Sequence, residues 1–237
     1  MTEFTTWRSL VDGAEITAIP DSVLLQYFAT QVTGGDTTWP DDNGVKDMSL
    51  TGDETDTTLS DGSEALSFDT SDVGTIDPPT ALEGDGLQEF AFEFAIQTTQ
   101  TDQGQIIRAD DGDQQFVIWQ NIDEDFNNDT GNIHVRLRDD TGAGFEFACD
   151  DPPNTADENR HNVSVDFPDT TSELPEIIID GDVQNLTFRD DTNPTDFVDW
   201  VDTFDLFSDV SNEWQGDVGA VRFHSTSIAE QTIDVYE

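Results

Sequence analysis

Apolar and polar residues alternate along most of the chain with the period of two that is typical of half-buried β-strands. From Ile19 onward the apolar runs are short, rich in Phe, Val and Ile, and separated by clusters of Gly, Pro, Asn and Asp, which form turns. This pattern predicts strands at Val23–Phe28, Ala65–Phe68, Glu89–Ile96, Gln105–Arg108, Gln115–Gln120, Asn132–Arg138, Phe145–Cys149, Asn162–Phe167, Glu176–Ile179, Val183–Phe188 and Gly216–His224. It therefore predicts an all-β fold, a β-sandwich of two packed antiparallel sheets. The stretch Thr192–Phe207 is ambiguous, and we expect a loop with a helical turn around Phe197–Val201.

One hairpin can be predicted residue by residue. On its first strand the apolar set alternates with a basic set, which are Ile133, Val135 and Leu137 against His134, Arg136 and Arg138. The segment Asp139–Gly142 fits a type I turn with its glycine in the left-handed position. That turn pairs apolar residues on the buried face, Leu137 with Phe145 and Val135 with Phe147. It also places Arg136 opposite Glu146 on the outer face, where opposite charges attract modestly.

The first residues follow a different pattern from the rest. Trp7, Leu10 and Val11 have the spacing of one helix face, so a short helical turn is expected there. The apolar stripe is too short to be a stable helix by itself. It either folds back on its own sandwich or docks on a neighbouring subunit or another protein of an assembly. We therefore expect an N-terminal assembly arm, residues 1–18, and a single sandwich domain, residues 19–237.

The net charge is the most informative feature of the composition. The 237 residues include 53 Asp and Glu but only 8 Lys and Arg, giving a formal net charge of -45. At about 1 M salt the Debye length is about 3 Å, so self-repulsion of this size is screened. The acids are interspersed with Phe, Ile, Val and Leu, which indicates an acidic surface over a folded core. Nucleic acid is an unfavourable partner, because the field repels phosphates.

Other residue counts restrict the kinds of protein and of site that are possible. Sixteen Phe and five Trp supply enough large apolar side chains for a core. Cys149 is the only cysteine, which excludes an internal disulfide and a cysteine-rich zinc site. The opening MTEFTTWRSL lacks the pattern of a signal peptide, and no apolar run reaches the roughly 20 residues that span a bilayer. We expect no membrane insertion.

Several segments, taken in order, resemble the laminin G-like (concanavalin A-like) jelly-roll family. They are IPDSVLLQYFAT with DDNGVKDMSLTG, SEALSFDTSDVGTI, NRHNVSVDF with PEIIIDGDVQNLTF, and WQGDVGAVRFHSTSIAEQTIDVY. The match covers roughly residues 19–237 and includes an Asp-Gly hairpin turn at Asp180 and Gly181. Where the family strand carries a Trp-His-His run, this chain has Asn159, Arg160 and His161. The resemblance implies a two-sheet sandwich, but not a function, because this fold hosts lectins, glycosidases, adhesion modules and virion proteins.

A second resemblance suggests the environment in which the protein works. Lysine-poor, Asp-rich surfaces are similar to those of haloarchaeal proteins, and WRSLVDGAEITAIPDS resembles the start of structural proteins of haloarchaeal tailed viruses. The leading hypothesis is a non-enzymatic virion structural protein, a turret, decoration or fibre module exposed on the particle surface. It would form homo-oligomers, contact other virion proteins, and touch a host surface glycan or S-layer. The alternative is a secreted or cell-surface glycan-binding module of a haloarchaeon.

Calcium is the candidate cofactor. Asp123, Asp125, Asn127 and Asp129 have the oxygen spacing of a calcium loop, but the glycine and glutamate of an EF-hand are missing. An acidic chain also produces such runs by composition alone. The family resemblance implies a second candidate at a loop edge, and we assign it to Asp69 and Asp72, beside the second strand.

Glycan binding needs aromatic platforms and planar hydrogen-bonding groups on an exposed face. Trp119 reaches an outer face, together with Gln115, if Phe116 and Ile118 point inward. The candidates for this site are Trp119, His134, Arg136 and Arg138. The competing interpretation is a cross-strand ion-pair ladder to Glu146, with Trp119 in the core.

Hydrolysis is disfavoured by spacing. Glu89 and Glu93 share a strand face, but four residues of strand separate them by about 13 Å, beyond the separation of a glycosidase pair. We expect no catalytic residues.

Overall fold

The computed structural model describes residues 23–77, 89–110, 115–121, 130–138, 143–150, 153–167, 173–192, 203–207, 213–225 and 228. For residues 7–8, 15–16, 110 and 190–192 it describes the backbone alone. The helical element in these ranges is a 3₁₀ turn, Ala29–Gln31, and all other named elements are strands. No helix within them is long and apolar enough to cross a membrane.

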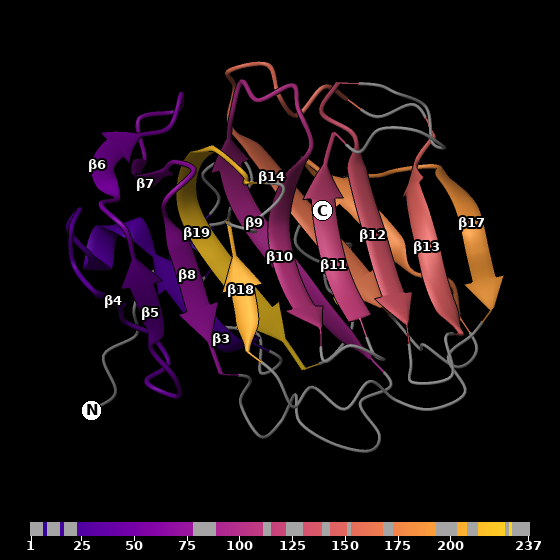
Figure 1. Ribbon diagram of the computed structural model, residues 1–237, viewed down its shortest axis with the longest axis horizontal. Helices are drawn as coiled ribbons and strands as arrows, with labels where there is room; N and C mark the ends of the chain where they lie inside the picture. The colour runs from indigo at the N-terminus through magenta and orange to yellow at the C-terminus, as the bar shows by residue number, and fades with distance from the viewer. Residues whose placement is uncertain are drawn as a thin grey trace.

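Nine antiparallel strands form the sheet that faces the viewer in Figure 1. Their spatial order is β17-β13-β12-β11-β10-β18-β8-β5-β4. Strands β10 to β13 follow one another in sequence and in space, whereas β17 and β18 join the sheet from later in the chain. The bounds are β4 Thr38–Trp39, β5 Met48–Thr51, β8 Val73–Ile76, β10 Gly104–Asp110, β11 Gln115–Gln120, β12 Ile133–Arg138, β13 Gly144–Cys149, β17 Leu186–Thr192 and β18 Phe204–Leu206.

Eight strands form the second sheet, in the order β16-β15-β14-β9-β19-β7-β6 with β3 also paired to β19. Strand β19 is long enough to pair with β7 near its start and with β3 near its end, while β9 runs along its other side. A separate two-stranded ladder joins β1 (Trp7–Arg8) to β2 (Glu15–Ile16). The remaining bounds are β3 Val23–Phe28, β6 Thr55–Thr58, β7 Glu64–Phe68, β9 Phe90–Gln97, β14 His161–Phe167, β15 Glu176–Ile179, β16 Asp182–Val183 and β19 Gly216–His224.

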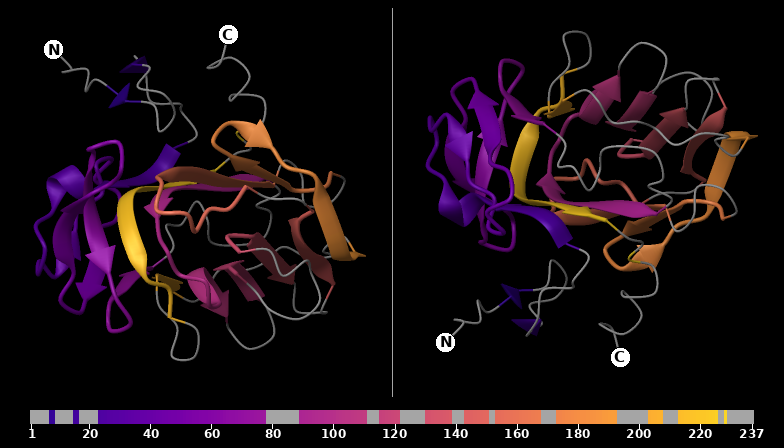
Figure 2. Two further views of the ribbon diagram at one scale, coloured as in Figure 1. Left: turned by 90° about the horizontal axis from the view of Figure 1, so that it is seen from above. Right: turned by 90° about the horizontal axis from the view of Figure 1, so that it is seen from below.

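The core lies between the two sheets, which Figure 2 shows as two curved layers facing each other. Phenylalanine fills much of it: the rings of Phe92 on β9 and Phe116 on β11 stack across the gap with centroids 4.9 Å apart. Phe90 and Phe167 stack at 4.5 Å on neighbouring strands of the second sheet. Burying a side chain of this size contributes about 1.5–3 kcal/mol relative to exposing it. The Phe-rich sequence therefore forms the sandwich core that it predicts.

The sequence pattern predicts most of the long strands within about two residues of their ends. One prediction is wrong: Val183–Phe188 is not a single strand. Val183 ends β16 in the eight-stranded sheet, and Leu186 begins β17 in the nine-stranded sheet. Between them Asn185 accepts a backbone hydrogen bond from Asp150, so the chain leaves one layer and enters the other. The ambiguous stretch contains strand β18, and residues 197–201 lie outside the described ranges.

The register of the β12–β13 hairpin is confirmed. Leu137 pairs with Phe145, Val135 with Phe147, and Arg136 with Glu146. Its turn, residues 139–142, lies outside the described ranges. The register follows from the alternation, because a slip of one residue would turn every apolar side chain of the strand to solvent.

The Asp-Gly turn of the family resemblance is also present. Asp180 and Gly181 join β15 to β16 with φ values of 52° and 89°, the left-handed pair that a two-residue type I′ hairpin requires. The Asp180 carboxylate accepts a hydrogen bond from the backbone of Asn162 at 2.8 Å and lies 2.7 Å from Nδ1 of His161. The turn is thereby fixed to strand β14.

Candidate functional site

The outer face of the nine-stranded sheet carries a cluster of arginines around one carboxylate. Glu146 on β13 is only 1% exposed at its side chain, and Arg136 on β12 lies directly opposite. Arg136 donates to both carboxylate oxygens, from Nε at 3.1 Å and from Nη2 at 2.9 Å. Arg138 donates from Nη2 at 2.8 Å, and Arg189 on β17 donates from Nη1 at 3.3 Å. We call Arg136, Arg138 and Arg189 the arginine patch.

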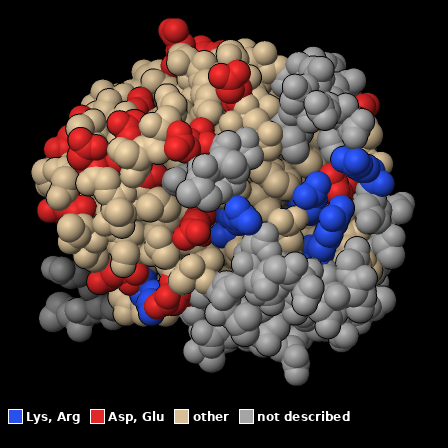
Figure 3. Space-filling model, in the orientation of Figure 1, with Lys and Arg blue, Asp and Glu red and all other residues tan. Residues whose placement is uncertain are grey.

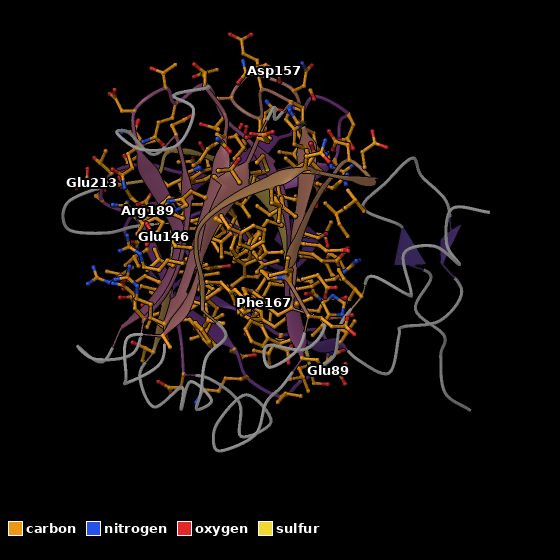
Figure 4. The ribbon with its side chains drawn as sticks, turned by 90° about the vertical axis from the view of Figure 1, so that its right-hand side faces the viewer. Glu89, Glu146, Asp157, Phe167, Arg189 and Glu213 are labelled. Carbon is orange, nitrogen blue, oxygen red and sulfur yellow. The ribbon has the colours of Figure 1, made fainter. Side chains whose placement is uncertain are left out.

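The figures show where this patch lies on the molecule. In Figure 3 basic side chains gather over part of the sheet face, on a surface whose other charged groups are mostly Asp and Glu. In Figure 4 Glu146 and Arg189 lie close together on the outer side of one sheet, while Phe167 lies between the sheets. The patch is therefore a surface feature and not part of the sandwich core.

Glu146 stays ionised in this environment. Burial alone would raise its pKa, but the hydrogen bonds from Arg136 and the charges of Arg136 and Arg138 outweigh burial and lower the pKa. A buried carboxylate without such partners would become neutral or destabilise the fold. The cross-strand ion-pair ladder of the sequence analysis is thus present in the structure.

An aromatic pair lies beside the arginine patch. Trp119 on β11 pairs in register with His134 on β12, and the two rings stack with centroids 4.9 Å apart at 17°. The guanidinium of Arg136 lies 5.1 Å from the Trp119 ring centroid, a cation–π contact. Burial lowers the pKa of His134 to about 3, so its imidazole is neutral at pH 7. Trp119 is 7% exposed, so it is buried rather than an open platform, and it lies on the face of β11 opposite Phe116 and Ile118.

The structure thus brings together the four glycan candidates, Trp119, His134, Arg136 and Arg138. Gln115 lies on the same face of β11 as Trp119, as the alternation of that strand predicts, and its side-chain oxygen accepts from Arg136 at 3.2 Å. Arg189 is a member that the sequence analysis missed, because its strand reaches β13 only after the chain has passed through the other sheet.

The carboxylates expected at the second strand form a cluster of three. Asp53, Asp69 and Asp72 each place a carboxylate oxygen within 4.8 Å of the others. Asp72 is buried, and its oxygens accept from the backbone of Asp53 at 2.9 Å and of Asp69 at 2.8 Å. These bonds fix the carboxylate between the two loop segments. Asp53 is a member that the sequence analysis missed.

Glu54 supplies a further oxygen next to this carboxylate cluster. Its side chain is buried, and Oε1 has no hydrogen-bond partner within the described residues. Burial raises the pKa of Glu54, and the nearby charges of Asp72 and Asp53 raise it further. Hard cations such as calcium are bound by carboxylate sets of this kind. The other calcium candidates, Asp123, Asp125, Asn127 and Asp129, lie outside the described residues.

A polar groove of about 820 Å³ begins at the carboxylate cluster. Asp69 lies at its edge, and its walls are mainly hydroxyl, amide and carboxylate side chains. Some of these side chains hydrogen-bond to backbone carbonyl groups. Thr98 donates to the backbone of Gln215, and Gln100 donates to the backbone of Glu213. No aromatic side chain with an exposed face lines the groove among the described residues.

The outer face of the other sheet holds an ion-pair network around Glu93. Glu93 accepts from Arg222 at 3.4 Å and lies 2.8 Å from Nε2 of His224. Burial would raise the pKa of Glu93, but the hydrogen bond and charge of His224 and the charge of Arg222 lower it to about 2. A carboxylate held in this way is a structural anion.

The expected helical turn near the N-terminus is wrong at Trp7. Trp7 and Arg8 form a strand that pairs with Glu15 and Ile16. A stripe of so few apolar residues does not offset the cost of starting a helix, whereas the hairpin pairs the same backbone groups. Leu10 and Val11 lie outside the described residues, so their assembly role stays a prediction.

Comparison with known proteins shows the fold. No protein-family model matches this sequence, and no curated protein sequence matches it. Among solved structures, the binding domain of Paraclostridial Mosquitocidal Protein 1 is similar with a TM-score of 0.65 and 9% identity, over 91% of this chain and 51% of that one. The binding domain of botulinum neurotoxin DC in complex with rat synaptotagmin II gives 0.62 and 11%, over 91% and 50%.

The binding domain of botulinum neurotoxin serotype G gives a TM-score of 0.60 and 13% identity, over 90% of this chain and 49% of that one. This chain therefore spans about half the length of these structures. Identities this low show the fold alone. The fold is a two-sheet antiparallel β-sandwich of the concanavalin A-like jelly-roll class.

Proposed function

We propose that this protein is a non-enzymatic binding module that recognises carbohydrate on a cell surface and works in concentrated salt. The observation that carries the proposal is the arginine patch beside the Trp119–His134 stack. Guanidinium and amide groups are flat and offer hydrogen bonds to a sugar ring, and the buried Trp119–His134 stack lies against the guanidinium of Arg136. They converge on one sheet face of a chain in which basic residues are rare.

Structural neighbours support a binding role. One botulinum neurotoxin DC binding domain was solved in complex with SialylT. Botulinum neurotoxin type C, another neighbour, depends on interaction with two ganglioside molecules to enter cells. These are statements about the toxins, and they favour a carbohydrate target here because the fold is shared over about nine-tenths of this chain.

The composition supports a more specific setting, a surface-exposed structural module of a haloarchaeal virus particle. A net charge of -45 suits brine, where it is screened. In that setting the protein forms homo-oligomers and contacts other virion proteins, with Trp7, Leu10 and Val11 in the assembly arm. Deleting residues 1–17 should leave the sandwich folded and lower the oligomer mass measured by light scattering. If the truncated chain unfolds, the arm belongs to the core.

Calcium is the proposed cofactor at the carboxylate cluster. Asp53, Asp69 and Asp72 would supply the oxygen ligands. The buried Glu54 carboxylate next to them would supply a further oxygen. The ion would neutralise part of a group of carboxylates that otherwise repel one another across a short distance. Its role would be to hold two loops in place at the edge of the groove.

A glycan array probed in about 1 M KCl tests the proposed function, since at this ionic strength the Debye length is about 3 Å. The expected result is retention of a defined set of glycans without release of reducing sugar. Release of reducing sugar would indicate a hydrolase. Failure to retain any glycan, by a protein that circular dichroism shows to be folded, would overturn the proposal.

A further inference from the structure

One histidine joins two loop segments through both of its ring nitrogens. Nδ1 of His161 lies 2.7 Å from the Asp180 carboxylate, and Nε2 lies 3.0 Å from the Asp157 carboxylate. Asp180 belongs to the turn between β15 and β16, whereas Asp157 belongs to the segment that leads into β14. The His161 side chain is only 9% exposed, so the two contacts are shielded from solvent on the histidine side. We call these two contacts the histidine clamp.

Only a protonated ring satisfies both contacts of the histidine clamp. An ionised carboxylate only accepts hydrogen bonds, and a neutral imidazole has a single N–H to donate. Burial would raise the pKa of both carboxylates, but hydrogen bonds from His161 outweigh it and lower both, that of Asp157 to about 2. Asp157 and Asp180 therefore stay ionised while the ring titrates. Deprotonation leaves a nitrogen lone pair facing a carboxylate oxygen.

The neighbouring charged groups do not replace the proton of the ring. Arg160 precedes His161, and its guanidinium donates to Asp61 at 2.5 Å and to Asn162 at 3.0 Å. Its charge also lowers the pKa of Asp180, but an arginine keeps its proton throughout this pH range. At about 1 M salt the Debye length is about 3 Å, so charges in direct contact still attract while more distant ones are screened.

The residue that follows Asp157 has a strained backbone. Glu158 has a φ of 70°, in the left-handed region, which a glutamate adopts only when its surroundings hold it there. Its backbone N–H donates to the carbonyl of Thr98 at 3.3 Å, and both residues line the polar groove. The contact of His161 with Asp157 therefore fixes a strained part of the groove wall.

We propose that the histidine clamp is a pH-sensitive device that holds the groove wall at Glu158 while the ring is protonated and releases it when the ring loses its proton. This inference goes beyond the proposed carbohydrate-binding function and does not depend on it. The hydrogen bonds to Asp180 and Asp157 raise the pKa of His161. The clamp is therefore fully formed below the ordinary pKa of about 6.5 and weakens as pH rises through the raised value.

Amide hydrogen exchange of the full chain in molar KCl measures the release, with each rate divided by the intrinsic rate at the same pH. The reporter is the Glu158 amide, and the reference is the Phe207 amide, which donates to Ile106 at 2.9 Å in the other sheet. The protection of Glu158 relative to Phe207 should fall about tenfold for each unit by which the pKa of His161 is raised. Proton NMR titration of the ring supplies that pKa.

Two variants should remove the pH step in opposite ways. His161→Gln presents a nitrogen to one carboxylate and an oxygen to the other, so Glu158 should be weakly protected at every pH. Asp180→Asn lets a neutral ring accept from the new amide at Nδ1 and donate from Nε2 to Asp157, so protection should persist to high pH. Asp182→Asn, the same substitution at an exposed position of β16, is the matched control and should keep the step.

Circular dichroism verifies that each variant is folded. The inference is overturned if the relative protection of Glu158 in the wild type stays constant while the ring titrates, or if the step persists in folded His161→Gln protein. If His161→Gln does not fold, Asp180→Asn decides, and an unchanged step in that variant overturns the inference. These measurements need no ligand, so their outcome is separate from that of the glycan array.

Discussion

Arg136 and Glu146 lie directly opposite each other on neighbouring strands, joined by two hydrogen bonds of 3.1 and 2.9 Å. This forked pair is the geometric centre of the arginine patch. Its carboxylate is almost completely buried and its guanidinium is partly exposed. The pair therefore links the stability of the sheet to the charge on its outer face.

Truncating Arg136 and truncating Arg189 should have unequal effects on stability. Arg136→Ala removes the forked partner of a buried carboxylate and should lower the free energy of unfolding by about 2–3 kcal/mol. Arg189→Ala removes a longer contact to Glu146 from an exposed arginine and should cost less than about 1 kcal/mol. Denaturant unfolding in molar KCl measures both. Equal losses would contradict the assignment of Arg136 as the structural partner.

His161 gives the sandwich a pH-dependent contact. Its ring lies between two carboxylates, 2.7 Å from Asp180 and 3.0 Å from Asp157, and the hydrogen bonds to Asp180 and Asp157 raise the pKa of His161. A raised folded-state pKa means that the contribution to stability is fully present below the unfolded pKa of about 6.5. It is lost as pH rises through the higher folded-state value.

Proton NMR titration of the ring, with unfolding measured across the same pH range, checks this prediction. Asp180→Asn keeps a residue suited to the left-handed turn but removes the carboxylate, so the pKa of His161 should fall toward its ordinary value. Asp182→Asn, at an exposed neighbouring position, is the matched control and should leave the pKa unchanged. An unperturbed His161 in the wild type would refute the contact.

Calcium should stabilise the chain through the carboxylate cluster. After chelation and return to molar KCl, added calcium at 100 times its dissociation constant should raise the free energy of unfolding by about 2.7 kcal/mol. Asp53→Ala removes an exposed ligand and should abolish the gain. Asp77→Ala, which breaks only the surface pair with Lys46, should not. A calorimetric titration of the stripped wild type without heat would eliminate the site.

Local alternation accounts for what the sequence could predict. It specifies which residues of β11, β12 and β13 face outward, so Trp119, His134, Arg136 and Arg138 could be placed on one face in advance. Alternation does not indicate which distant strand lies next to β13, so Arg189 could not be predicted as part of this site. Short strands with polar sequences were also missed: β6, Thr55–Thr58, has largely exposed side chains and carries no apolar alternation.

The carboxylates of the candidate metal site show the same limit of prediction from local sequence. Asp69 and Asp72 are near each other in sequence, and their shared loop could be anticipated. Asp53 joins them because β5 and β8 are neighbours in the nine-stranded sheet, and Gly52, with φ of 136°, directs the chain past Asp72. A pairing between strands separated by another hairpin leaves no signal in either segment alone.

The most direct test of the binding face follows the arginine Nε–H signals by ¹⁵N NMR while an array-selected glycan is titrated into the protein in molar KCl. The account predicts that the signals of Arg136, Arg138 and Arg189 shift together and saturate, while those of Arg160 and Arg222 stay in place. Saturable shifts confined to the groove residues, with the arginine patch unmoved, would contradict it.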